Sequence, residues 1–198
     1  MTQRTPYELF SDFEGTIVLP EISYREWVSS RVQDHEKFEA DCADRLKRAS
    51  ELQSIQAWEN YLDVYSKLFT LQDFKEISLK YSMNKIFESW CKRFLKAHDY
   101  ERANLTVVTR GFAPIARNYF ERSDVKATLH DLKISIAALI GSEPYIDKLG
   151  VMKGLKSVIY PKRKFVKDGH IMLGDEGEER EFGNYPYFVN LSKWKTSE

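Results

Sequence analysis

The stretch that decides the fold is Ser11-Asp12-Phe13-Glu14-Gly15-Thr16, near the start of a chain of 198 residues. Residues 7–13 form a strand that is weak by composition, and we expect the chain to leave it as a loop. Asp12 and Glu14 stand at alternate positions, and a loop that Gly15 permits can turn both carboxylates toward one pocket. One acid could then attack a substrate while the other moves protons.

Downstream of this stretch, the apolar residues between about 23 and 98 recur at intervals of three and four, which predicts four or five amphipathic helices. Ser23 followed by Glu26 matches a capping box at the start of this block, and Thr70 with Asp73 repeats the pattern. We therefore expect a helical insertion of about eighty residues.

From residue 104 onward, the pattern changes to short apolar runs bounded by Gly, Pro and Asp, which favours strands buried on both faces. Strands are predicted at 105–108, 134–140, 157–160, 170–173 and 187–191. A helix over 113–121, with Pro114 in its first turn, joins the first two as a βαβ unit. The predicted fold class is α/β, with a parallel sheet and an inserted helical domain above the edge where such folds bind ligands.

Three later stretches also carry chemistry-bearing residues at predicted strand ends. Val107-Val108-Thr109-Arg110-Gly111 ends in a hydroxyl and a glycine just before a helix, whose N-terminus attracts phosphate. Lys162-Arg163-Lys164 is a short basic cluster. Ile171 to Glu179 is an apolar strand that runs into carboxylates of the kind that bind Mg²⁺.

In this order, the four stretches resemble the haloacid-dehalogenase-like (HAD) superfamily of phosphohydrolases. The family pattern is Asp-x-Asp-x-Thr after a strand, a strand ending in Ser or Thr, a lysine, and Gly-Asp with another acid four residues on. The resemblance spans residues 7 to 191, and the helical block corresponds to the cap of the phosphoserine-phosphatase-like branch. It implies a Rossmann-like core of residues 1–20 and 100–198, with an α-helical cap over 21–99.

The resemblance also implies roles for individual residues. Asp12 would attack phosphorus and become an aspartyl phosphate, while Glu14 would act as general acid and base. A lysine, Lys162 by preference, would neutralise charge on Asp12. The predicted substrate-binding residues are Thr109, Arg110, Gly111 and Lys164. The predicted Mg²⁺ ligands are Asp12, the backbone carbonyl of Glu14, Asp175 and Glu179, with Glu179 ligating directly or through water.

Two positions depart from the family pattern. Glu14 stands where the family has Asp, and its extra methylene moves the carboxyl group by more than about 1 Å, which matters because proton transfer needs hydrogen-bond reach. The lysine has four candidates. The family spacing favours Lys153 or Lys156, whereas the local context favours Lys162 or Lys164.

The sequence thus predicts a Mg²⁺-dependent phosphatase that acts on a small phosphorylated metabolite. An alternative is a catalytically impaired protein of the same fold that binds a phosphorylated ligand in a regulatory role. A dehalogenase or phosphonatase fits less well, because position 14 and the last stretch are both acidic.

The bulk properties limit partners and location. Thirty acidic and thirty basic residues give a net charge of zero, which predicts neither nucleic-acid nor membrane partners. No secretory signal is evident, so a cytoplasmic location is expected, and a homodimer is left open. Cys42 and Cys91 fall in predicted helices and are interpreted as small buried apolar residues.

Overall fold

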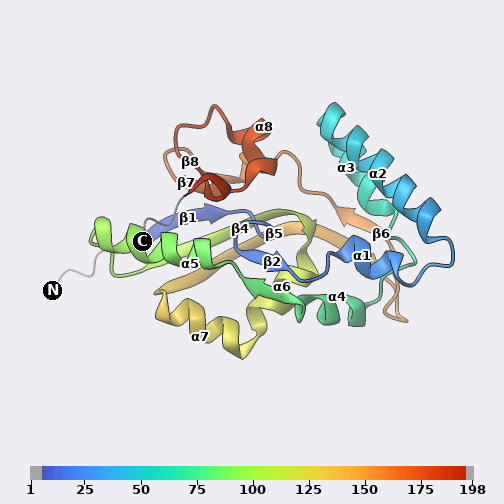
Figure 1. The fold of residues 1–198 in the computed structure, drawn as a ribbon, viewed down its shortest axis with the longest axis horizontal. Helices are drawn as coiled ribbons and strands as arrows, with labels where there is room; N and C mark the ends of the chain where they lie inside the picture. The colour runs from blue at the N-terminus through green and yellow to red at the C-terminus, as the bar shows by residue number, and fades with distance from the viewer. Residues whose placement is uncertain (1–5, 195–198) are drawn as a thin grey trace.

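The computed structural model describes residues 6–194, and its centre is a mostly parallel sheet in the order β6-β5-β4-β1-β7-β8 (Figure 1). The strands are β1 (Tyr7–Ser11), β4 (Ala103–Phe112), β5 (Ile134–Ile146), β6 (Met152–Ser157), β7 (Ile171–Gly174) and β8 (Phe188–Asn190). β1 pairs in parallel with both β4 and β7, while β6 runs antiparallel to β5. The carboxyl ends of β1, β4 and β7 therefore meet at one edge, and the predicted α/β class is confirmed.

One predicted strand is wrong, and one helix of the structure was not predicted. The strand predicted at 157–160 is wrong, because β6 ends at Ser157 and the apolar residues that follow lead out of the sheet toward Lys162. Those residues are buried by packing beside the sheet rather than by pairing within it: Ile159 belongs to an apolar cluster with Phe10 and Val108. The predicted helix over 113–121 is present as α6 (Ala113–Glu121), followed by the unpredicted α7 (Ser123–Asp131).

The insertion after β1 contains α1 (Tyr24–Ser29), α2 (His35–Leu52), α3 (Ile55–Asp63), α4 (Leu71–Ser78) and α5 (Lys85–Ala97). Both predicted capping boxes form, at Ser23 with Glu26 and at Thr70 with Asp73. A separate two-stranded antiparallel sheet, formed by β2 (Val18–Pro20) and β3 (Tyr81–Met83), joins the start of the insertion to its later part. The β2–β3 sheet thereby fixes the insertion directly beside the loop that follows β1.

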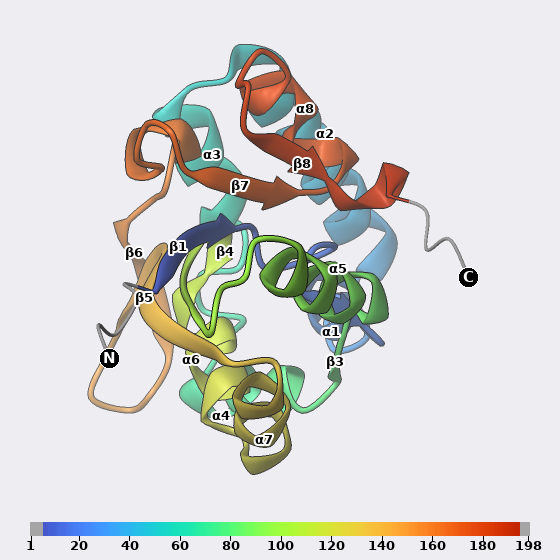
Figure 2. The same ribbon diagram turned by 90° about the vertical axis from the view of Figure 1, so that its left-hand side faces the viewer.

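The helices lie on different sides of the sheet. α4, α6 and α7 lie together on one side of β4 and β5, whereas α2 and α3 lie on the side of β7 and α8 (Glu179–Phe182) (Figure 2). One contact ties α2 to α8 directly, because the Arg180 guanidinium donates to the Ser50 carbonyl at 2.9 Å. The insertion therefore contacts the segment that follows β7 at the carboxyl edge of the sheet.

Aromatic rings join the insertion to the sheet in one apolar cluster. Phe69, between α3 and α4, packs 5.5 Å from Phe112 at the end of β4, measured between ring centroids. Phe94 of α5 lies 5.1 Å from Tyr7 of β1 in the same measure. The division into a core of 1–20 and 100–198 and a cap of 21–99 stays a prediction, and residues 1–5 and 195–198 of that core lie outside the described part.

Two further sequence expectations concern cysteine and membranes. Cys42 and Cys91 are both buried and free, with no disulfide between them. None of the helices in residues 6–194 combines the length and apolar character that a bilayer-spanning segment needs.

Asp73 is a polar link between α1 and α4. Its carboxylate accepts hydrogen bonds from the Thr70 N–H at 2.9 Å and the Trp27 indole N–H at 3.0 Å, and it pairs with Arg31. Burial would raise the pKa of Asp73, but these donors outweigh it and the pKa is lowered. The charged carboxylate therefore stabilises the folded insertion.

We predict that Asp73→Asn lowers the free energy of unfolding by about 2 kcal/mol at pH 7, since hydrogen bonds to a charged group are lost. Because the folded pKa lies below the unfolded value of about 3.9, the contribution is complete above that value and disappears as pH falls through the folded pKa. Urea unfolding at several pH values measures the difference between variant and wild type. Asp34→Asn is the control, because Asp34 is an exposed N-cap of α2 and Asn caps equally well. An equal loss in both variants at pH 7 would contradict the prediction.

Candidate active site

Asp12 follows the last residue of β1 and forms a buried ion pair with Lys162. The Lys162 Nζ lies 2.7 Å from Asp12 Oδ1 and 2.8 Å from Glu178 Oε1. The lysine is 1% exposed, so its charge is compensated by these two carboxylates rather than by water. Asp12 Oδ1 also accepts the N–H of Phe13 at 2.7 Å, which orients the carboxylate at the strand end.

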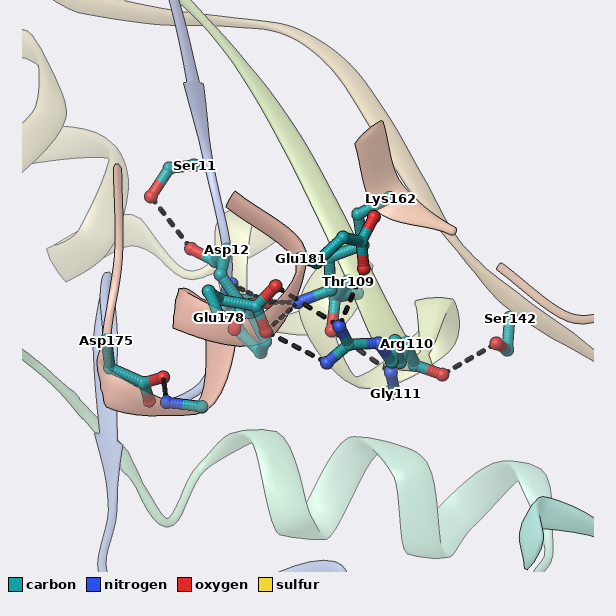
Figure 3. Close-up of polar contacts among 12 residues, drawn as sticks. Ser11, Asp12, Thr109, Arg110, Gly111, Ser142, Lys162, Asp175, Glu178 and Glu181 are labelled. Carbon is teal, nitrogen blue, oxygen red and sulfur yellow. Dashed lines mark hydrogen bonds and ion pairs between the residues drawn. The ribbon is translucent and has the colours of Figure 1, made fainter. Parts of the chain in front are cut away.

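Two more carboxylates reach the same point from the segment after β7. Asp175 caps the 3₁₀ helix η2 (Glu176–Glu178) by accepting the Gly177 N–H at 2.8 Å. Candidate ligand oxygens of Asp12, Asp175 and Glu178 all lie within 4.8 Å of one another. The side chains of Asp12, Glu178, Lys162 and Arg110 converge at this point, as Figure 3 shows.

The structure corrects the fourth predicted metal ligand. Glu179 points away from the cluster, where its carboxylate accepts from Asn190 at 2.9 Å and pairs with Lys193. Glu178 lies in the cluster instead, because the chain after Asp175 is a 3₁₀ helix, in which residues three apart lie on the same side. The family spacing of four residues suits an α-helical turn, so the sequence alone pointed one residue too far.

Gly15 is required by the close approach of two segments. Its φ is +77°, in the left-handed region that favours glycine, and a Cβ atom there would lie 2.0 Å from Asp175 Oδ2. The Asp175 carboxylate can therefore lie against this residue, as it does here, only if the residue has no side chain. The contact sets the position of the Asp175 carboxylate.

The end of β4 supplies Thr109, Arg110 and Gly111. Thr109 is buried, and its hydroxyl accepts the Gly111 N–H at 3.1 Å. Arg110 donates to Glu178 Oε1 at 2.9 Å and to Glu181 Oε2 at 2.8 Å, and its guanidinium lies 4.9 Å from the centre of the Trp58 ring. Arg110 thus connects the carboxylate cluster to α3 of the insertion.

Glu14 lies on the side of the site that faces the β2–β3 sheet. It is half-buried, and its Oε1 accepts a hydrogen bond from the Tyr81 hydroxyl. Burial raises the pKa of Glu14, although the Tyr81 hydrogen bond and the charge of Lys162 act in the opposite direction. A raised pKa favours the protonated form that a general acid needs.

Of the four candidate lysines, Lys162 alone contacts Asp12 within the described residues. Lys164 is exposed although it shares the 3₁₀ helix η1 (Lys162–Phe165) with Lys162. Lys153 pairs with Asp147 at 3.2 Å, and Lys156 is exposed on β6. The predicted role of Lys164 in substrate binding therefore has no contact to support it.

The electrostatics of the cluster follow from burial and from an excess of carboxylates. Burial raises the pKa of Asp12 to about 7, against the lowering effect of Lys162. Burial also raises the pKa of Asp175. In Glu178 the charges of Lys162 and Arg110 outweigh burial, and the pKa is lowered. A divalent cation at this point would relieve the repulsion between the carboxylates and favour their ionised forms.

The residues present fit a hard divalent cation. Asp12, Asp175 and Glu178 offer only oxygen ligands, which Mg²⁺ prefers. Two cationic side chains, Lys162 and Arg110, contact these carboxylates. Sequence analysis missed Glu178, Glu181, Tyr81 and Trp58. Glu178 was adjacent to the predicted ligand, but the other three are brought to the site by contacts across the fold that leave no local sequence signal.

Comparison with family models and with curated proteins finds no match to this sequence. Solved structures are similar. A phosphoserine phosphohydrolase-like protein from Francisella tularensis subsp. tularensis SCHU S4 is 14% identical, covers 94% of this chain and 87% of its own, and has a TM-score of 0.63. A phospho-aspartyl intermediate analogue of phosphoserine phosphatase is 12% identical, with coverages of 91% and 83% and a TM-score of 0.56.

A HAD family hydrolase from Salmonella enterica subsp. enterica serovar Typhi is also similar, at 10% identity, coverages of 87% and 58%, and a TM-score of 0.54. At such low identities, the likeness establishes the fold alone. The chain has the fold of the haloacid-dehalogenase-like hydrolases in its phosphoserine-phosphatase-like form, as the order of the four sequence stretches predicted.

We predict that Gly15→Ala strongly weakens Mg²⁺ binding, because the new methyl group displaces the Asp175 carboxylate. Gly169→Ala is the matched control, since Gly169 has φ +81° and no atom within 4 Å of its would-be Cβ. Both variants should lose about 1 kcal/mol of stability from the left-handed backbone, and only Gly15→Ala should lose metal affinity. Calorimetric titration with Mg²⁺ and urea unfolding separate the two effects. Equal Mg²⁺ affinity in both variants would contradict the role of Gly15.

A second pair of variants tests whether Glu178, rather than Glu179, is the metal ligand. We expect Glu178→Gln to lower Mg²⁺ affinity by at least the roughly 10- to 100-fold that loss of an outer-shell partner costs, because a direct ligand loses its charge. Glu179→Gln should leave the affinity near the wild-type value. Gln keeps the shape of either side chain and removes its charge. The same titration measures both, and a larger loss in Glu179→Gln would restore the ligand set that the sequence predicted.

Proposed function

We propose that this protein is a Mg²⁺-dependent phosphatase that hydrolyses a small phosphorylated organic molecule. The observation that carries the proposal is the convergence of Asp12, Lys162, Asp175 and Glu178 at the carboxyl edge of the sheet. Such an edge is where open α/β sheets place their ligands. The fold shared with phosphoserine-phosphatase-like structures supports the same conclusion.

Asp12 is the nucleophile in this proposal. One of its carboxylate oxygens forms a bond to phosphorus, the bond from phosphorus to the ester oxygen breaks, and the phosphoryl group remains on Asp12 as an aspartyl phosphate. Lys162, at 2.7 Å from Oδ1, compensates negative charge on Asp12 and on the transferring group. Water then attacks the phosphorus, and the products are inorganic phosphate and free Asp12.

Glu14 is the general acid of the first step and the general base of the second. In the first step its carboxyl group gives a proton to the departing ester oxygen, which leaves as an alcohol. In the second step the resulting carboxylate takes a proton from the attacking water. The raised pKa of Glu14 suits the first of these roles.

Mg²⁺ would be held by Asp12, Asp175, the backbone carbonyl of Glu14 and Glu178, the last in place of Glu179. When bound, the ion supplies positive charge that offsets the repulsion between the anionic phosphate and the anionic nucleophile. Its requirement for oxygen ligands matches the chemistry of this residue set.

The remainder of the substrate has space beside Arg110. A cavity of about 420 Å³ lies between α2, α3 and the segment after β7, and its lining includes Arg110, Trp58, Tyr160 and Arg180. Within the described residues, the Trp58 Nε1 and the Arg110 Nε are buried donors without a partner. We assign Thr109 and Gly111, at the end of β4, to the phosphoryl group. A larger cavity of about 750 Å³ is lined by α6, α7 and β5 and does not adjoin the carboxylates.

A second candidate is a protein that binds a phosphorylated ligand without turnover. One observation favours it: the residue that transfers protons in this proposal is Glu14, where the family that the sequence resembles has Asp. Absence of hydrolysis in the experiment below, together with binding of inorganic phosphate in a calorimetric titration, would favour this second function.

We predict that wild-type protein hydrolyses para-nitrophenyl phosphate only with Mg²⁺, and that Asp12→Asn lowers the rate by at least about 10³-fold because the nucleophile is lost. Asp131→Asn is the control, since Asp131 is exposed on α7 and far from the cluster. Release of para-nitrophenolate is followed with Mg²⁺ and with a chelator. Hydrolysis that survives in Asp12→Asn, or that ignores the metal, would refute the proposed phosphatase.

A further inference from the structure

Tyr81 lies in β3 of the two-stranded β2–β3 sheet, and its side chain contacts the site. Its hydroxyl donates to Glu14 Oε1, although the two residues are 67 positions apart in sequence. Tyr81 is 2% exposed, and its ring packs 5.8 Å from that of Phe13, which precedes Glu14. The hydrogen bond is therefore shielded from water, where it orients a side chain most effectively.

The backbone around this contact is fixed on both sides. β2 and β3 pair so that Pro20 lies opposite Tyr81, and the Gly15 N–H donates to the Val18 carbonyl at 2.9 Å. Asn84, just after β3, donates from its side chain to the Thr16 carbonyl at 3.0 Å and from its backbone N–H to the Ile17 carbonyl at 2.8 Å. The loop that carries Glu14 and the strand that carries Tyr81 thus behave as one unit.

This contact gives a physical reason for Glu at position 14. A glutamate side chain has one more rotatable bond than aspartate, so its carboxyl group reaches further and is less fixed in direction. The Tyr81 hydroxyl binds one oxygen of the longer side chain. Within residues 6–194 the other oxygen, Oε2, makes no hydrogen bond, and it remains available to a substrate.

We propose that Tyr81 is a positioning residue that holds Oε1 of Glu14, so that Oε2 faces the ester oxygen of the substrate. The inference rests on the proposed phosphatase function and adds a residue to it. Tyr81 touches neither substrate nor metal in this scheme. Its effect on the reaction passes through Glu14.

The role is specific enough to be separated from a structural one. A leaving group that is a stable anion, such as para-nitrophenolate, needs little help from a general acid, whereas the more basic phenolate needs a proton. Loss of Glu14 positioning should therefore slow phenyl phosphate more than para-nitrophenyl phosphate. The two substrates share a ring and a phosphate, so a general loosening of the site would affect both alike.

The experiment compares Tyr81→Phe with Tyr119→Phe on both substrates. Tyr119 is the matched control because it is 0% exposed, its ring also packs on Phe13 at 5.6 Å, and its hydroxyl has no partner within the described residues. We expect kcat/KM for phenyl phosphate to fall about tenfold in Tyr81→Phe, as for one lost hydrogen bond, and less for para-nitrophenyl phosphate. Tyr119→Phe should leave the ratio of the two unchanged.

Two variants of Glu14 complete the test. Glu14→Gln keeps the side-chain length but cannot transfer a proton, so its loss should be selective for phenyl phosphate and larger than that of Tyr81→Phe. Glu14→Asp withdraws the carboxyl group from Tyr81, so adding Tyr81→Phe to it should change nothing further. Urea unfolding of each variant shows whether it is folded.

The outcomes separate the two proposals. Equal losses on both substrates in Tyr81→Phe, or the same ratio as in Tyr119→Phe, would overturn the positioning role while hydrolysis by Asp12 stands. An additive effect of Tyr81→Phe in the Glu14→Asp background would overturn it as well. Absence of Mg²⁺-dependent hydrolysis in the wild type would remove the phosphatase proposal, and this inference with it.

Discussion

The buried ammonium of Lys162, between Asp12 and Glu178, is the interaction on which the site depends. Three carboxylates lie within 4.8 Å of one another, and without a cation among them they would repel. Burying charge costs several kcal/mol per ion, and the cost is offset only when partners are close and well oriented. Three segments therefore meet at one point: the end of β1, the start of η1 and the turn after β7.

The backbone provides this meeting point by the order of its strands. β1 lies between β4 and β7, all parallel, so residues that follow these strands share one edge of the sheet. Lys162 comes from the segment between β6 and β7, which leaves the sheet and returns beside it. Gly15 has no Cβ, and this leaves room for the Asp175 carboxylate beside the loop after β1. Close packing of the backbone and neutralisation of charge therefore support the same geometry.

The insertion meets this edge from two directions. From one direction, Tyr81 of the β2–β3 sheet binds Glu14. From the other, Trp58 of α3 covers Arg110, whose guanidinium is already bound to Glu178 and Glu181. The insertion is thus more than a cover, because its side chains contact groups that also contact the carboxylate cluster. Shared aromatic packing with the sheet, as between Phe69 and Phe112, makes these contacts part of one core.

The sequence by itself determined the features that depend on neighbours in the chain. Helical periodicity, the boxes at Ser23 and Thr70, and apolar runs ending in Asp or Thr are local signals. They sufficed for the fold class and for placing Asp12 and Asp175 at one edge of the sheet. The sequence preferred Lys162 but left three other lysines open, and the tertiary structure pairs Lys162 with Asp12. Tertiary structure alone decided that a 3₁₀ turn presents Glu178 instead of Glu179, and that Tyr81 binds Glu14. Each of these depends on contacts between distant segments, whose energy is invisible in a local pattern of residues.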